Sequence, residues 1–160
     1  MAPTTIPQPR RTMHGVEAGR LAMVLAVLER RCGVKLFNCD VYVSTVGGAK
    51  VSDPSADLAA ALAVASAAYD RNVDPRLVAL GEIGLAGELR RVPGTDRRLA
   101  EAARLGFAEA VIPAEADAAR RTTTTVRGGM RVHAVPTLDQ ALGVLGLLPD
   151  QRRAKLVASG

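Results

Sequence analysis

Ser55 is the side chain whose surroundings in the sequence most suggest covalent chemistry. It lies in the string Asp53-Pro54-Ser55-Ala56-Asp57, at the start of an alanine-rich stretch. A serine attacks a carbonyl group only when a nearby base, such as a histidine or a deprotonated lysine, takes its proton. No lysine occurs between Ser55 and Pro113, and the two histidines, His14 and His133, lie far apart in the sequence. A Ser-His-Asp triad is therefore weakly supported, because nothing in the sequence itself brings either histidine beside Ser55.

The other reactive residues give little support for a metal or nucleotide site. Cys32 and Cys39 form no Cys-x-x-Cys pair, and with the two histidines they give no metal-ligand spacing, so they are predicted to be reduced and structural. A phosphate loop needs Gly-x-x-x-x-Gly-Lys-Ser/Thr, and the nearest string, Gly47-Gly48-Ala49-Lys50-Val51, lacks the spacing and the hydroxyl. We expect this chain to hold no metal and no cofactor, and not to hydrolyse ATP by itself.

The chain is basic, with 21 lysines and arginines against 16 acidic residues and a formal charge of +5. This balance favours a polyanionic partner, most often nucleic acid. Because aromatic residues make up only 2% of the chain, phosphate contact is expected rather than base stacking. The candidate DNA-contacting residues are Lys50, Arg90, Arg91, Arg97, Arg98, Arg120 and Arg121. For each of them the alternative is a solvated side chain or an ion pair with a neighbouring subunit.

Hydrophobic periodicity and turn residues predict a mixed α/β fold with short connections. Gly33 and Gly106 are the predicted helix ends, and Thr137 is the predicted cap of the last helix. In chain order the predicted elements are a helix over 16–31, an antiparallel hairpin of 35–38 and 41–45, a short strand at 49–51, a helix from 55 to 69, strands over 76–83 and 87–92, a helix over 97–105, a strand over 110–112, a mobile loop over 114–129, a strand over 130–135 and a helix over 138–147.

The chain is predicted to form one domain, residues 15–149, because 160 residues is an ordinary single-domain length. Residues 1–14 are predicted to be a linker or arm, since the first eleven include three prolines, and residues 150–160 to be a charged tail. No apolar run reaches the roughly 20 residues that span a bilayer, and the N-terminus lacks a signal peptide's apolar stretch. We expect a cytoplasmic location and no membrane partner.

The string around Ser55, followed by residues 81–93 and by Val111-Ile112-Pro113, resembles the Lon protease domain. In that family a Pro-Ser-Ala-Gly serine is the nucleophile and a lysine just before the second helix is its base. Ser55 matches the serine, but Asp57 stands where the family has glycine, and the base region, Gly94–Arg98, contains no lysine.

These departures predict that the catalytic function is lost. An arginine side chain, with a pKa above about 12, stays protonated and cannot take the serine proton. Asp57 would also place a negative charge beside the developing oxyanion of an acyl-transfer reaction. No residue is therefore predicted to be catalytic, and Ser55 is a vestigial nucleophile. Ser55 is the favoured cap of the helix that begins there, and Asp53 is the alternative.

A closer resemblance is to the C-terminal Lon-like domain of the bacterial RadA/Sms DNA repair family. It rests on residues 15–21, 24–31 and 40–48 together with the strings above, and it covers about Arg10 to Leu148. It implies an α/β fold with a mixed sheet, the Lon protease-like, ribosomal protein S5 domain 2-like fold. The zinc finger and ATPase core of that family are missing here, so ATP, magnesium and zinc are expected only in the missing parts of the parent protein.

The same resemblance implies a homo-hexameric ring, DNA as a partner and a role in recombination and branch migration, with the recombinase RecA as a partner through the parent protein. The favoured function is ring scaffolding with sequence-independent DNA binding. One alternative is a purely structural oligomerisation domain without DNA contact. Another is a residual serine peptidase that uses Ser55.

Overall fold

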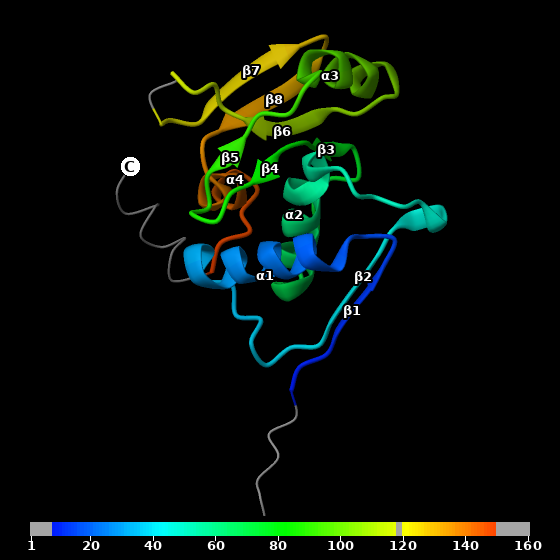
Figure 1. Cartoon of the computed structure of the whole chain (residues 1–160). Helices are drawn as coiled ribbons and strands as arrows, with labels where there is room; N and C mark the ends of the chain where they lie inside the picture. Colours follow the sequence, from blue (N-terminus) through cyan, green and yellow to red (C-terminus); the bar gives the residue numbers. More distant parts are fainter. Residues whose placement is uncertain (1–7, 118–119, 150–160) are drawn as a thin grey trace, which may run out of the picture.

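A mixed four-stranded sheet organises the part of the chain that the structure describes, residues 8–117 and 120–149 of a computed structural model (Figure 1). Its strand order is β3–β6–β8–β7, in which β3, β6 and β8 are parallel and β7 is antiparallel to β8. The strands are β1 Arg11–His14, β2 Val41–Ser44, β3 Leu77–Ala79, β4 Glu82–Ile83, β5 Leu89–Arg90, β6 Glu109–Pro113, β7 Thr123–Arg127 and β8 Met130–Val135. The predicted α/β class with a mixed sheet is confirmed.

Helices cover both faces of this sheet because its central strands are apolar on both sides. On β6, Ile112 packs in a cluster with Leu99 of α3, while Val111 packs in the larger core formed with α1, α2 and α4. Figure 1 shows α3 on one side of the sheet and the other three helices on the opposite side. The helices are α1 Ala18–Cys32, α2 Asp57–Ala68, α3 Thr95–Arg104 and α4 Leu138–Val144, with short 3-10 turns η1 Val46–Gly48 and η2 Pro54–Ala56.

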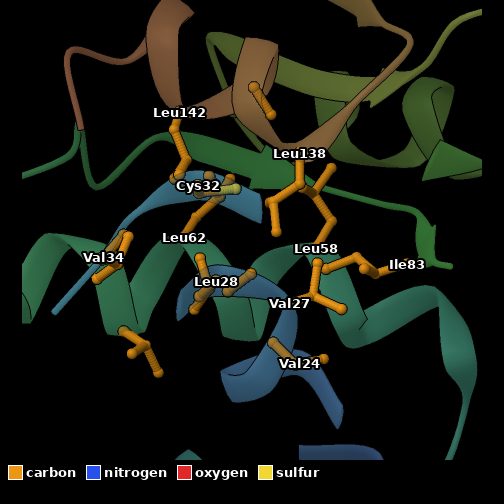
Figure 2. Close-up of a cluster of buried hydrophobic side chains, with 14 of the residues drawn as sticks. Val24, Val27, Leu28, Cys32, Val34, Leu58, Leu62, Ile83, Leu138 and Leu142 are labelled. Atoms are coloured by element: carbon orange, nitrogen blue, oxygen red, sulfur yellow. The ribbon is translucent and has the colours of Figure 1, made fainter. Parts of the chain in front are cut away.

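The main core forms where α1, α2 and α4 meet. Leu28 of α1, Leu62 of α2 and Leu142 of α4 are each at most 3% exposed, and Figure 2 shows them in one cluster. The apolar spacing predicted for the first helix is confirmed, and Gly33 ends that helix in the left-handed conformation with φ 73°. Thr137 caps α4 as predicted, because its hydroxyl accepts from the Gln140 N–H at 3.2 Å.

The predicted antiparallel hairpin of residues 35–38 and 41–45 is wrong. Strand β2 instead pairs in parallel with β1, with Arg11 opposite Val41. The segment between α1 and β2 turns back so that two of its carbonyl oxygens accept from the Arg11 guanidinium. The residues of β1 therefore belong to the folded part of the chain, and the short strand predicted at 49–51 is reduced to one bridge between Val16 and Val51.

The strand predicted over 76–83 is interrupted at Gly81, which separates β3 from β4. The Gly81 N–H donates to the carbonyl of Ser55 at 2.9 Å, and a Cβ on Gly81 would lie 2.9 Å from Cγ of Pro113. A side chain at this position would therefore clash, and the backbone leaves the sheet to pair with the start of α2. The short β4 then forms an antiparallel hairpin with β5.

The loop predicted over 114–129 contains the edge strand β7, so that prediction is also wrong. β-Branched threonines favour an extended backbone. Gly128 and Gly129, with φ 56° and 79°, form the two-residue turn that folds β7 back on β8. The charged tail predicted over 150–160 and most of the predicted arm, residues 1–7, lie outside the described residues. Within the described ranges, no helix is long and apolar enough to cross a membrane.

Candidate functional site

Ser55 lies in η2, the turn that leads directly into α2, and it is only 6% exposed. Asp53 is the residue that caps this turn, because its Oδ1 accepts from the Ser55 N–H at 2.9 Å, and Pro54 occupies the first position. Of the two residues predicted as the cap, Asp53 is thus confirmed and Ser55 is not.

The Ser55 hydroxyl accepts from Arg98, which lies on α3 in the segment where the family's lysine was sought. Arg98 Nη1 donates to Ser55 Oγ at 2.7 Å, and its Nη2 lies 3.4 Å from Asp53 Oδ2. A guanidinium group has five N–H donors and no acceptor. It can orient the serine oxygen, but it offers no lone pair to take the serine proton.

Asp57 makes a separate buried ion pair, which was not predicted from the sequence. Its side chain is 4% exposed, and Arg20 of α1 binds it in a bidentate manner, with Nε–Oδ1 2.9 Å and Nη2–Oδ2 2.6 Å. The Ile83 N–H also donates to Oδ2, at 3.1 Å. The hydrogen bond to Asp57 raises the pKa of Arg20 above its ordinary value. The negative charge of Asp57 is thus held by Arg20, and the pair ties α1, α2 and β4 together.

Asp53 supplies a pH-dependent prediction. Hydrogen bonds from the Ser55 N–H and from the Ser55 hydroxyl, with a smaller contribution from the Arg98 guanidinium, lower the pKa of Asp53 below its usual value. A carboxylate whose pKa is lowered by folding stabilises the fold above its unfolded-state pKa of about 3.9, and this contribution is lost as the pH falls through the folded-state pKa. Asparagine keeps the cap but does not titrate.

We therefore expect wild type to have a higher Tm than the Asp53→Asn variant at neutral pH, with the difference shrinking as the pH falls below the unfolded-state pKa of about 3.9. Thermal unfolding by circular dichroism at several pH values measures this difference. The other carboxylates are the same in both proteins, so their contribution to the pH dependence of the Tm cancels in the comparison. Asp53→Ala, which loses the cap as well, should lower the Tm at pH 7 by about 2–4 °C. A difference between wild type and Asp53→Asn that stayed constant to about pH 2.5 would contradict the assigned hydrogen bonds.

The predicted DNA-contacting residues fall into two groups in the structure. Three of them are engaged within the chain: Arg90 with Glu88 at 2.8 Å, Arg91 with Glu115 at 2.6 Å, and Arg98 with Ser55 and Asp53. The other four form no ion pair among the described residues; they are Lys50 before η2, Arg97 on α3, and Arg120 and Arg121 before β7. Three of the seven predicted charges are therefore neutralised by acidic side chains of the same chain.

A chain of side-chain hydrogen bonds across three strands was missed by the sequence analysis. His133 of β8 is 7% exposed; its Nδ1 lies 2.8 Å from Thr124 Oγ1 on β7, and its Nε2 lies 2.6 Å from Glu109 Oε1 on β6. The residues are 9 and 24 positions apart along the chain, so only the strand order brings them together. The described residues include no group of three or more histidine, cysteine or acidic side chains that could hold a metal.

The chain matches a known protein family over most of its length. Residues 22–146 match the family described as Lon protease (S16) C-terminal proteolytic domain, a range that includes Ser55, Asp57 and Arg98. The chain belongs to the Lon protease family. The predicted Lon protease-like fold is thereby confirmed.

Several curated relatives of this Lon-family chain carry the name DNA repair protein RadA. The protein from Mycolicibacterium smegmatis is 56% identical over 105 residues, 66% of this chain and 22% of the relative. The Escherichia coli protein is 45% identical over 136 residues, which are 85% of this chain and 28% of the relative. The Streptococcus pyogenes serotype M1 protein is 39% identical over 145 residues, which are 91% of this chain and 31% of the relative. The resemblance to the Lon-like domain of RadA is confirmed, and the chain spans less than a third of the length of these relatives.

Proposed function

We propose that this chain is a non-proteolytic Lon-like domain of a RadA-type DNA repair protein, and that it scaffolds a hexameric ring and holds DNA by its phosphates. The observation that carries the first part is the contact of Arg98 Nη1 with Ser55 Oγ at 2.7 Å. A serine nucleophile needs a base at that place, and a protonated guanidinium is a donor only. The buried hydroxyl is therefore a structural partner of Arg98.

The proposal for DNA rests on the excess of positive charge and on the four cations without an ion pair. A net charge of +5, with Lys50, Arg97, Arg120 and Arg121 free of acidic partners among the described residues, favours a polyanion. One domain that touches a few phosphates should bind with a Kd of about 10⁻⁴–10⁻⁶ M. Six linked copies would raise this affinity through effective concentration, so assembly is part of the mechanism.

The parent protein would supply the rest of the activity. We expect ATP-driven branch migration, the magnesium and zinc that it uses, and any contact with the recombinase RecA to reside in parts outside this chain. The name of the relatives, DNA repair protein RadA, supports a repair role for the parent protein. A cytoplasmic location is part of the same proposal.

A serine-directed diphenyl phosphonate tests the non-proteolytic part of the proposal. We expect no adduct on Ser55 of the wild-type chain between pH 7 and pH 10, as measured by intact mass. Arg98→Lys places an amine near the same oxygen, and a lysine loses its proton near its ordinary pKa of about 10.4. That variant should therefore become labelled as the pH approaches 10.

Ser55→Ala combined with Arg98→Lys is the control, because it removes the only oxygen assigned to the reaction. Stoichiometric labelling of Ser55 in the wild-type chain at neutral pH would show that the serine has a base, and the alternative of a residual peptidase would then stand. Labelling of the double variant would show that the reagent reacts elsewhere.

A further inference from the structure

The four-stranded sheet has one protected edge and one open edge. At the protected edge, β3 has only three residues, all of them half-buried, and the chain leaves the sheet at Gly81. At the open edge, all five residues of β7 are exposed, and among the described residues only β8 pairs with this strand. Figure 1 shows β7, in yellow, at the outer margin of the sheet. This edge therefore presents unpaired backbone groups to its surroundings.

The strand β7 carries none of the features that usually protect an edge strand. Lysine, proline and β-bulges keep other chains away from such edges. From Thr123 to Val126 the strand has only uncharged β-branched residues, and its pairing with β8 runs without a bulge as far as Arg127. Val126 has 74% of its surface exposed. Because β-branched residues favour an extended backbone, β7 is suited to pair with another strand.

The backbone groups that point to the open edge belong to Thr124 and Val126. Arg131 of β8 lies opposite Val126, and its N–H donates to the carbonyl of Ala108 at 2.9 Å, on the side away from β7. In an antiparallel pair, residues that bond to each other alternate with residues whose backbone groups point outward. The N–H and C=O groups of Val126 therefore point away from β8, as do those of Thr124 two residues earlier.

Two copies of β7 can satisfy these groups by pairing with each other in an antiparallel manner. The register must place the outward-pointing residues of the two strands opposite each other. A register centred on Thr125 does so, because Thr124 then lies opposite Val126 of the second copy. It uses all five residues of each strand and places Arg127 opposite the neutral Thr123.

Charge and length favour this register over its two neighbours with the same hydrogen-bonding pattern. A register centred on Thr124 would place Arg127 opposite Arg121, and like charges directly opposite each other are destabilising. A register centred on Val126 would pair only three of the five strand residues. The register centred on Thr125 alone pairs the whole strand with itself and opposes no like charges.

We propose that β7 is a pairing surface for a second copy of this chain, in the two-fold antiparallel register centred on Thr125. The contact joins the two sheets into one continuous sheet and covers Val126. A two-fold contact uses the same surface on both copies. It joins two chains and cannot by itself close a ring of six, so it goes beyond the proposed scaffold. Because one strand per copy is a small interface, the contact between free chains should be weak.

A disulfide trap at the two-fold axis tests this register. Opposite residues that share no backbone hydrogen bond lie about 4.5 Å apart at Cα, which a disulfide can span. Thr125 and its copy form such a pair. In a Cys39→Ser background, which removes the exposed thiol, Thr125→Cys should form a disulfide between two chains on oxidation with copper phenanthroline. We expect a dimer on a non-reducing denaturing gel, and a tryptic peptide linked to its own copy.

Thr123→Cys in the same background is the matched control, because Thr123 is an equally exposed threonine of the same strand. In the proposed register the two introduced thiols would lie four residues apart along the strands, roughly 14 Å, which is too far for a disulfide. Thr123→Cys should therefore link more slowly than Thr125→Cys, by about tenfold or more. Equal rates for the two variants, or no link in Thr125→Cys, would overturn the proposed contact.

Thr125→Lys tests the contact without a cross-link, because it places two lysines opposite each other at the axis. The position is exposed, so the Tm should stay that of the wild type. The sedimentation coefficient should rise with protein concentration less steeply for Thr125→Lys than for the wild type, and an equal rise would count against the pairing. A six-subunit protein in which Thr125→Cys does not link would refute the contact and leave the ring. A linked dimer from a protein that is monomeric when reduced would support the contact and refute the ring.

Discussion

Replacing Arg20 with methionine should lower the free energy of unfolding by about 3 kcal/mol, one of the largest effects expected for a single side chain here. The substitution leaves the Asp57 carboxylate, 4% exposed, without its cation. Removing one partner of a buried pair is costly because the other charge stays buried. The Tm should fall by about 6–12 °C, measured by thermal unfolding together with urea unfolding.

Two further variants separate this effect from a general loss of arginine. Arg104→Met removes a surface pair with Glu101, in which the side chains are 68% and 54% exposed, and should leave the Tm unchanged. Arg20→Met combined with Asp57→Leu removes both charges and should recover much of the lost stability. A Tm of Arg20→Met equal to that of the wild type would show that Asp57 does not depend on this pair.

Reversing the charge of Lys50 and Arg97 together should weaken binding of a short DNA duplex by at least tenfold and lower the dependence of log K on log salt by about two. Neither side chain forms an ion pair among the described residues, so both are available to phosphates. Fluorescence anisotropy at several salt concentrations measures both quantities. Light scattering on the same samples checks that the assembly persists.

The matched control reverses Arg76 and Arg104, which changes the net charge by the same amount but acts on arginines outside the predicted DNA-contacting set, paired with Asp74 and Glu101. It should weaken binding less and leave the salt slope nearly unchanged. Equal losses in the two double variants would mean that only net charge matters. Unchanged binding in both double variants would favour the alternative of a structural domain without DNA contact. The arginine–carboxylate pairs within the chain show that its arginines can act in ion pairs of this structural kind.

The helices were predictable because each buries an apolar stripe whose spacing is visible locally. Leu21, Val24 and Leu28 recur at helical intervals, and all are at most 1% exposed in α1. Strand partners were not predictable in the same way. The β1–β2 pairing joins residues about 30 positions apart, whereas the local turn after α1 suggested a hairpin. The exposed threonines of β7 lack the alternation that marks a half-buried strand.

The site could be predicted only in part. The resemblance to the Lon family placed the expected base within a short segment that holds both Arg97 and Arg98. It did not distinguish between them, because successive residues of a helix point about 100° apart and the phase of α3 depends on packing. The Arg20–Asp57 pair spans 37 residues, and the sequence showed only an acidic residue in place of glycine. A carboxylate at the start of a buried helix needs a cation nearby. Asp57 was therefore the signal in the sequence that could have directed attention to Arg20.

Molar mass by light scattering, with and without a short duplex at low and high salt, tests the proposed ring and DNA contact most directly. We expect a species near six times the 16.7 kDa chain that binds the duplex at low salt and releases it as the salt concentration rises. A 16.7 kDa monomer that binds no DNA under any of these conditions would contradict both proposed roles, ring scaffolding and DNA contact. Assembly and DNA affinity would then belong to other parts of the parent protein.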